Sequence, residues 1–227
     1  MSYLGRHYRT YALDFWGFGE SGKKRETYAV QDFVSLVDQF MDQLGIVQAP
    51  LVGHSMGGTV SLSVAIQYPQ RVMKVVVVGS PISGSSLAWP LKWAGYRPIA
   101  FMLFNMMGLF RTSMLVASPF ICGDPRFPDM MDRDLSRTTV ESFLRSIASL
   151  RRTDLRSNLA KINVPVMGMY GDKDNIVDPK QWKPLEAGVG NSHTERFPKA
   201  GHFIMLDEPQ PFINKLKSFL DEELPAK

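Results

Sequence analysis

Apolar positions recur along the chain in two patterns, and each pattern predicts a different kind of element. Between Val30 and Leu44 they return every three or four residues, as in a helix with one buried face, and Gly45 follows as a C-terminal glycine should. The same spacing over 211–224 predicts a closing helix. The side chains expected to face inward are Phe33, Val34, Val37, Phe40, Met41 and Leu44 in the first helix and Phe212, Leu216, Phe219 and Leu220 in the second.

Other stretches are apolar at nearly every position, which is typical of strands in a parallel sheet that helices cover on both faces. Val72–Val78 and Val164–Tyr170 are the clearest cases. Shorter strands are expected at Arg9–Leu13, at the residues that end in Leu51-Val52, and at Glu195–Pro198. Strands that alternate with helices predict an α/β fold with a doubly wound, mostly parallel sheet.

The segment 83–159 interrupts this alternation because it has no strand-like run. It is rich in large, flexible apolar side chains, which suit an adaptable pocket and also the inner faces of ordinary helices. We expect a helical cap, or lid, at 83–159 and a core formed by residues 1–82 and 160–227. The side chains concerned are Trp89, Trp93, Phe101, Met102, Phe104, Met106, Met107, Met114, Met130 and Met131.

Composition and charge exclude several classes of protein. The chain has 227 residues, of which 44% are hydrophobic and 21% charged, as in a globular protein. Its net charge of +4 is scattered and forms no nucleic-acid-binding stripe. No secretory signal and no apolar run of the roughly 20 residues needed to span a bilayer is present, so we expect a cytoplasmic protein without stable membrane insertion. The single cysteine, Cys122, allows no internal disulfide and forms no metal pattern, and no metal or other cofactor is expected.

The five residues Gly53–Gly57 carry the strongest chemical signal. They read G-H-S-M-G, a pattern typical of the sharp strand-to-helix turn that exposes a nucleophilic serine, here Ser55. The turn strains the serine backbone and brings the positions two before and two after it together, so we expect both to require glycine. An apolar strand precedes the motif and an apolar helix follows it until Pro69.

A serine nucleophile needs a base and an acid, and both are expected later in the chain. The strand that ends at Tyr170 leads into Gly171-Asp172-Lys173-Asp174, and the last strand leads into Gly201-His202. We expect His202 to be the base and Asp174 the carboxylate that orients it. The alternatives are Asp172, which suits a turn, and Asp178, which suits a helix cap.

The remaining histidines are alternatives to His202. His54 lies inside the turn but is expected to point away from the serine hydroxyl. His193 is expected at the surface, and His7 near the frayed N-terminus.

These motifs together resemble the α/β-hydrolase superfamily, in its group of serine esterases, haloperoxidase-like enzymes and carbon–carbon bond hydrolases. A further matching piece is Leu13–Ser21, in which the resemblance implies that Asp14 shapes a loop. The resemblance implies Ser55 as nucleophile, His202 as base, Asp174 as acid and the backbone N–H of Met56 as the first oxyanion donor. It also implies a second donor from a loop after an earlier strand.

That loop and the family's first three strands have no counterpart here, so we expect the sequence to lack an N-terminal part of the fold. The alternative is that a partner or a rearrangement fills the gap. An unpaired sheet edge, poor solubility and weak activity would follow. The expected function is a serine hydrolase that cleaves an ester or related acyl bond of a small apolar substrate. The alternatives are carbon–carbon bond hydrolysis by the same triad, or a non-catalytic binding protein that has lost the second oxyanion donor.

Overall fold

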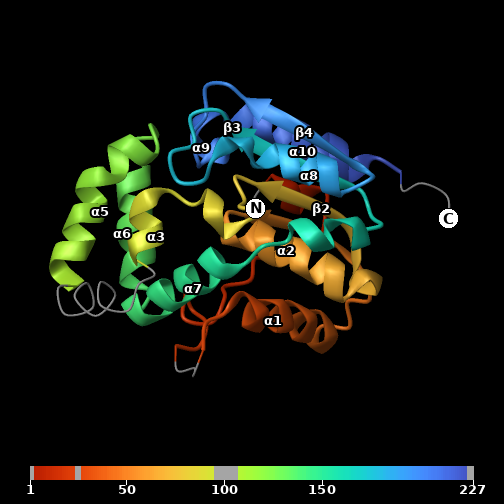
Figure 1. The fold of residues 1–227 in the computed structure, drawn as a ribbon, viewed down its shortest axis with the longest axis horizontal. Coiled ribbons are helices and arrows are strands. Elements are labelled where there is room, and N and C mark those ends of the chain that lie inside the picture. Colours follow the sequence, from red (N-terminus) through yellow and green to blue (C-terminus); the bar gives the residue numbers. More distant parts are fainter. Residues whose placement is uncertain (1–2, 24–26, 95–106, 224–227) are drawn as a thin grey trace.

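The computed structural model describes residues 3–23, 27–94 and 107–223, and at its centre is an open parallel sheet (Figure 1). Four strands lie side by side in the order β1-β2-β3-β4, and all neighbouring pairs are parallel. The strands are β1 (Ala49–His54), β2 (Val72–Val78), β3 (Val166–Gly171) and β4 (Ser192–Phe197). The open parallel α/β sheet predicted from the sequence is thus confirmed.

Helices cover both faces of the sheet. On one face lie α2 (Met56–Gln67) and α8 (Trp182–Gly188), with α1 (Val30–Gln43) packed against α2. On the other face lie α9 (Ile204–Asp207) and α10 (Pro209–Asp221), which buries Leu216 and Phe219 against the sheet. The valines of β2 alternate between the two cores: Val75 and Val77 face α2, and Val76 and Val78 face α10. This two-sided burial explains why β2 is apolar almost throughout.

Two sequence predictions are wrong at the edges of this core. The segment Arg9–Leu13 belongs to no strand, and it is preceded by a single 3₁₀ turn at Leu4–Arg6. A strand needs a neighbour for its backbone hydrogen bonds, and no described strand pairs with these residues. Leu44, expected to face inward, is 48% exposed because α1 has already ended at Gln43.

Between β2 and β3 the chain forms helices. They are α3 (Trp89–Ala94), α5 (Met107–Ile121), α6 (Phe127–Ser136) and α7 (Val140–Arg152), and α3, α5 and α6 lie beside the sheet (Figure 1). The second half of α7 instead packs into the core through Ile147 and Leu150. Phe101, Met102, Phe104 and Met106 lie outside the described residues. The division into a core and a lid over 83–159 stays a prediction.

Short 3₁₀ helices join several elements, at Pro69–Arg71, Gly84–Ser86, Arg156–Lys161 and Pro179–Gln181. Within the described ranges no helix has the length and apolar character needed to cross a bilayer.

One charged side chain is buried in the sheet. Lys74 of β2 is only 3% exposed, and its ammonium group donates to the carbonyl oxygens of Phe219 at 2.6 Å and Leu220 at 3.2 Å, and to that of Glu222. These carbonyls lie at or just beyond the C-terminal end of α10, where the helix dipole favours a cation. Lys74 therefore fixes the closing helix to the sheet.

Candidate active site

Three side chains with complementary chemistry follow the carboxyl ends of strands in the one sheet. Ser55 comes directly after β1, Asp174 follows β3 and His202 follows β4. Parallel strands end at the same edge of a sheet, so the fold brings these distant residues to one rim, where open α/β sheets bind ligands.

Ser55 has a strained backbone. Its φ of 54° and ψ of −123° make it the single non-glycine residue with positive φ in the part of the chain that the structure describes. Such strain costs about 1–3 kcal/mol and persists only where the surroundings enforce it. The sharp turn from β1 into α2 enforces it here, as the G-x-S-x-G motif predicts.

The glycines around Ser55 differ in their steric requirement. A Cβ added at Gly53 would lie 2.2 Å from the backbone carbon of Gly57, so Gly53 has no room for a side chain. A Cβ at Gly58 would lie 2.0 Å from Ser80 Oγ. At Gly57 an added Cβ would meet no atom within 4 Å. The expectation that both Gly53 and Gly57 are required thus holds sterically for Gly53 alone.

His202 and Asp174 form a buried pair. His202 Nδ1 lies 2.8 Å from Asp174 Oδ2, and their side chains are 4% and 1% exposed. The other carboxylate oxygen of Asp174 accepts from the backbone N–H groups of Ile176 at 2.8 Å and Val177 at 2.9 Å. Because carboxylate oxygens accept hydrogen bonds, we assign His202 as the donor from Nδ1. This tautomer leaves Nε2 as the acceptor that a general base needs.

The alternative acids and bases lie elsewhere. Asp172 pairs with Arg196 at 2.7 Å, and Asp178 caps a 3₁₀ helix by accepting from Lys180 N at 2.9 Å. His193 and His7 are exposed. Of the candidates weighed from the sequence, Asp174 is the carboxylate that the fold places on His202.

The backbone connects Ser55 to this pair. Ser55 N donates to Val78 O at 2.8 Å, and the next residue, Gly79, lies so close to the pair that an added Cβ would be 3.2 Å from His202 Nδ1 and 3.3 Å from Asp174 Oδ2. Within the described residues, Ser55 Oγ and the His202 ring share no hydrogen bond. Bonds of this kind are often long in unliganded sites and shorten when substrate binds.

His54 has a role that the sequence did not reveal. Its Nε2 donates to the carbonyl oxygen of His202 at 3.0 Å, and the two rings are 4.7 Å apart. Burial, and then repulsion from the charge that His202 carries when protonated, lowers the pKa of His54 to about 3. His54 is therefore neutral at physiological pH and ties the loop of His202 to the turn that carries Ser55. The available sequence signal for this role was the place of His54 in the motif, between Gly53 and Ser55.

Asp14 shapes its loop, as the resemblance implied. Its Oδ2 accepts from Glu20 N at 3.0 Å, and its carbonyl oxygen accepts from Ser21 Oγ at 2.6 Å. A Cβ at Gly19, where φ is 52°, would lie 2.1 Å from the Asp14 carboxylate. The loop therefore closes tightly on this side chain.

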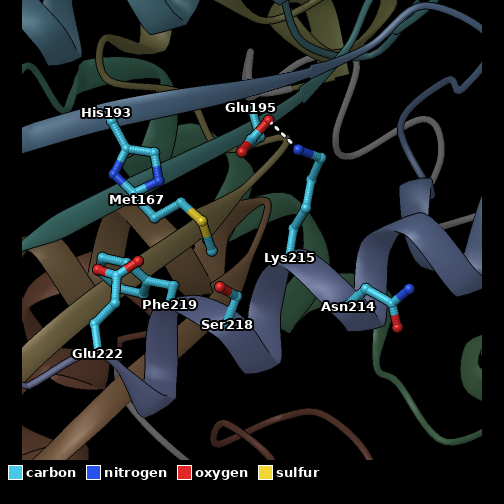
Figure 2. A pocket seen from close by; sticks show the side chains of 8 residues that line it. All are labelled: Met167, His193, Glu195, Asn214, Lys215, Ser218, Phe219 and Glu222. Atoms are coloured by element: carbon cyan, nitrogen blue, oxygen red, sulfur yellow. Dashed lines mark ion pairs between the residues drawn. The ribbon is translucent and has the colours of Figure 1, made fainter.

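A hollow of about 250 Å³ lies at the opposite end of the strands (Figure 2). It is lined by Met167 and His193, near the starts of β3 and β4, and by Phe219 of α10, with Lys215 paired to Glu195 at 2.6 Å across its rim. Ser55, His202 and Asp174 do not line it. Across the described ranges no three His, Cys, Asp or Glu side chains are grouped so as to hold a metal ion.

Comparisons with known proteins agree with this architecture. Residues 4–209 match the family model described as serine aminopeptidase, S33. A 2-hydroxy-6-oxononadienedioate/2-hydroxy-6-oxononatrienedioate hydrolase of Escherichia coli is 28% identical over 226 residues, covering 94% of this chain and 76% of the relative. A pimeloyl-[acyl-carrier protein] methyl ester esterase of Serratia marcescens is 27% identical over 231 residues, covering 96% and 86%.

The likeness extends to solved structures. An esterase from Exiguobacterium antarcticum superposes with a TM-score of 0.78 at 23% identity, covering 92% of this chain and 80% of the other. At this identity the likeness is evidence for the fold alone. Membership of the family rests on the family model, which matches most of the sequence. The chain thus belongs to the α/β-hydrolase superfamily and is a hydrolytic enzyme of that fold.

Proposed function

We propose that the protein is a serine hydrolase that cleaves an ester or related acyl bond of a small apolar substrate through Ser55, His202 and Asp174. The observation that carries the proposal is the buried His202–Asp174 pair at 2.8 Å beside the strained backbone of Ser55. This arrangement supplies a nucleophile, a base and the group that orients the base.

The reaction would proceed in two half-reactions. His202 Nε2 takes the proton of Ser55 as Oγ attacks the acyl carbon, and then gives that proton to the departing alcohol, which leaves an acyl-enzyme. Water, deprotonated by His202, attacks the acyl carbon; the bond from that carbon to Ser55 Oγ breaks, and His202 returns the proton to Oγ, which releases the acid and restores Ser55. Asp174 holds the imidazole in the Nδ1–H tautomer and stabilises the imidazolium that forms in each step.

The negative charge that develops on the acyl oxygen requires donors. Met56 is the first residue of α2, where backbone N–H groups have no carbonyl partner within the helix. The backbone bonding of this helix end begins two residues later, where Gly58 N donates to Ser55 O at 3.0 Å. We assign Met56 N–H as one oxyanion donor. The second donor, which the family resemblance implies in a loop after an earlier strand, stays a prediction.

The helical segment 83–159 is proposed as the lid of the site. Phe127, at the start of α6, packs against Phe203, the residue next to His202, with ring centroids 4.5 Å apart and ring planes tilted by 54°. A helical cover close to the base, rich in apolar side chains, favours a small apolar substrate. The Serratia marcescens relative, named as a methyl ester esterase, supports ester cleavage in particular.

Carbon–carbon bond hydrolysis by the same residues is the second candidate. It is favoured by the Escherichia coli relative, whose name describes a hydrolase of 2-hydroxy-6-oxo dienedioates. The two reactions are separated by substrate: p-nitrophenyl esters of increasing acyl length test the first, and a 2-hydroxy-6-oxo-diene acid tests the second.

A non-catalytic binding protein is the remaining alternative, and a fluorophosphonate probe tests it. We expect the probe to label Ser55 in the unmodified protein and to fail with Ser55→Ala and with His202→Ala. Ser63→Ala is a matched control, because Ser63 Oγ is engaged with Thr59 O at 2.8 Å inside α2. An unlabelled Ser55 in a folded protein would refute the serine hydrolase.

A further inference from the structure

The C-terminal end of α5 reaches both loops that carry the proposed acid and base. Asn175, which follows Asp174, donates from Nδ2 to the carbonyl oxygen of Phe120 at 2.6 Å. On the side of His202, a Cβ added at Gly201 would lie 3.4 Å from Ile121 O. The last turn of α5 is thus in contact with the residue after the acid and the residue before the base.

Asp207 joins this helix end to the base loop through a single carboxylate. One oxygen accepts from Gly201 N at 2.8 Å. The other accepts from Gly123 N and from the thiol of Cys122, each at 3.4 Å. Asp207 therefore binds the backbone directly before His202 and, at the same time, the backbone directly after α5.

Two side chains of this contact region are buried. Cys122 is only 4% exposed, and burial raises the pKa of its thiol to about 11, so it is protonated and can donate to Asp207. Phe127, 3% exposed, packs on Phe203, whose ring in turn lies 5.3 Å from the ring of His202. The carboxylate and the ring pair form two parallel connections between the helical segment and the base loop.

We propose that Asp207 is a positioning residue that couples the docking of the α5 end to the placement of His202. This proposal rests on the proposed function, in which His202 is the base. When the α5 end leaves the loop, Asp207 loses two of its three donors and no longer holds Gly201 firmly. His202 is therefore placed to take the proton of Ser55 only while the α5 end is docked. This confines the reaction to a covered site.

The test compares Asp207→Ala and Asp207→Asn with the unmodified protein. Asn keeps the volume but has only one acceptor oxygen, so it can accept either from Gly201 N or from the donors of Cys122 and Gly123, but not from both sides. Asn175→Ala loosens the α5 end without changing any charge near Cys122. Glu208→Gln is the matched control, since the side chain of Glu208 lies next to Asp207 in sequence and accepts a single exposed bond, from Lys199 N at 3.3 Å, among the bonds of the described residues.

Three quantities are measured for each protein: the rate constant and the final stoichiometry of fluorophosphonate labelling, and the rate at which a disulfide reagent modifies Cys122. For Asp207→Ala we expect full stoichiometry, labelling slower by about ten-fold or more, and modification of Cys122 faster by about ten-fold or more. Asp207→Asn and Asn175→Ala are expected to change both rates in the same directions by smaller factors. Glu208→Gln is expected to leave both rates within about two-fold of the unmodified protein.

A loss of folded protein alone would lower the stoichiometry and leave the labelling rate constant unchanged, and that outcome overturns the proposal. Slower labelling with Cys122 still protected overturns it as well, because the base would then be displaced without undocking. If the unmodified protein is not labelled at all, the proposed function fails. In that case unchanged protection of Cys122 in Asp207→Ala and Asp207→Asn would refute the docking role separately.

Discussion

His54 Nε2 lies 3.0 Å from the carbonyl oxygen of His202, so the residue before the proposed nucleophile holds the backbone of the proposed base. The two residues are 148 positions apart in the sequence, and the hydrogen bond joins the end of β1 to the loop after β4. Burial disfavours the charged form of His54, and the resulting low pKa of this side chain has a consequence for stability.

Acid is expected to destabilise the protein partly through His54. An unfolded histidine has a pKa of 6.5 and the folded one about 3, so between these values the unfolded chain binds a proton that the folded chain excludes. Stability is therefore intact above about pH 6.5 and falls as the pH is lowered toward 3, by at most about 2 kcal/mol at pH 5. His54→Gln keeps a donor for His202 O and cannot titrate. Urea unfolding at pH 7 and pH 5 should show a smaller acid loss for this variant, whereas parallel losses would exclude His54 as the cause.

The three glycines around Ser55 are expected to respond differently to alanine. Gly53→Ala and Gly58→Ala place a methyl group within 2.2 Å and 2.0 Å of existing atoms, so each should lower the free energy of unfolding by about 1–3 kcal/mol or more. Gly57→Ala enters open space in the first turn of α2 and should be neutral or stabilise by up to about 1 kcal/mol. Thermal unfolding of the three variants side by side provides the measurement. An equal loss in all three would contradict the geometry.

Local patterns in the sequence predicted most of the sheet and the turn. Val72–Val78 was predicted with its observed bounds, because a strand covered on both faces is apolar at nearly every position. The strained Ser55 was predicted because glycines at fixed offsets report a backbone requirement. In both cases the physical cause acts within a few residues of the signal.

Features that depend on distant partners were not predictable in the same way. Arg9–Leu13 has a strand-like pattern, but pairing is decided by a neighbour that the pattern does not contain. The bond from His54 to His202 and the bridge from Asp207 to Cys122 join segments brought together only by the fold. Lys74 did leave a signal, as a lone charge within a run of valines, because a buried cation requires oxygen partners.

Asp174→Asn is expected to abolish most activity while the fold is retained. The amide oxygen can still accept from Ile176 N and Val177 N, but the NH₂ group then faces His202 Nδ1 and donates to it. The imidazole is forced into the Nε2–H tautomer, which cannot take the proton of Ser55, and the rate of ester hydrolysis should fall by about 10³–10⁴. Asp172→Asn, at a surface pair with Arg196, is the matched control and should keep nearly full activity. The measurement is the initial rate of p-nitrophenyl ester hydrolysis for both variants. Equal losses of rate would contradict the proposal that Asp174 orients His202.

Lys74→Met is expected to destabilise the protein although it places an apolar side chain among valines. Methionine fills a similar volume, but the carbonyl oxygens of Phe219 and Leu220 lose their buried donor, and each unsatisfied group costs about 1–3 kcal/mol. The matched control is Lys217→Met on α10 itself, which removes a solvent-exposed pair with Asp221 and should cost about 0–1 kcal/mol. Urea unfolding at neutral pH gives both values. If Lys74→Met is as stable as Lys217→Met, the end of α10 does not depend on the lysine, and the anchoring of the closing helix must come from Leu216 and Phe219 alone.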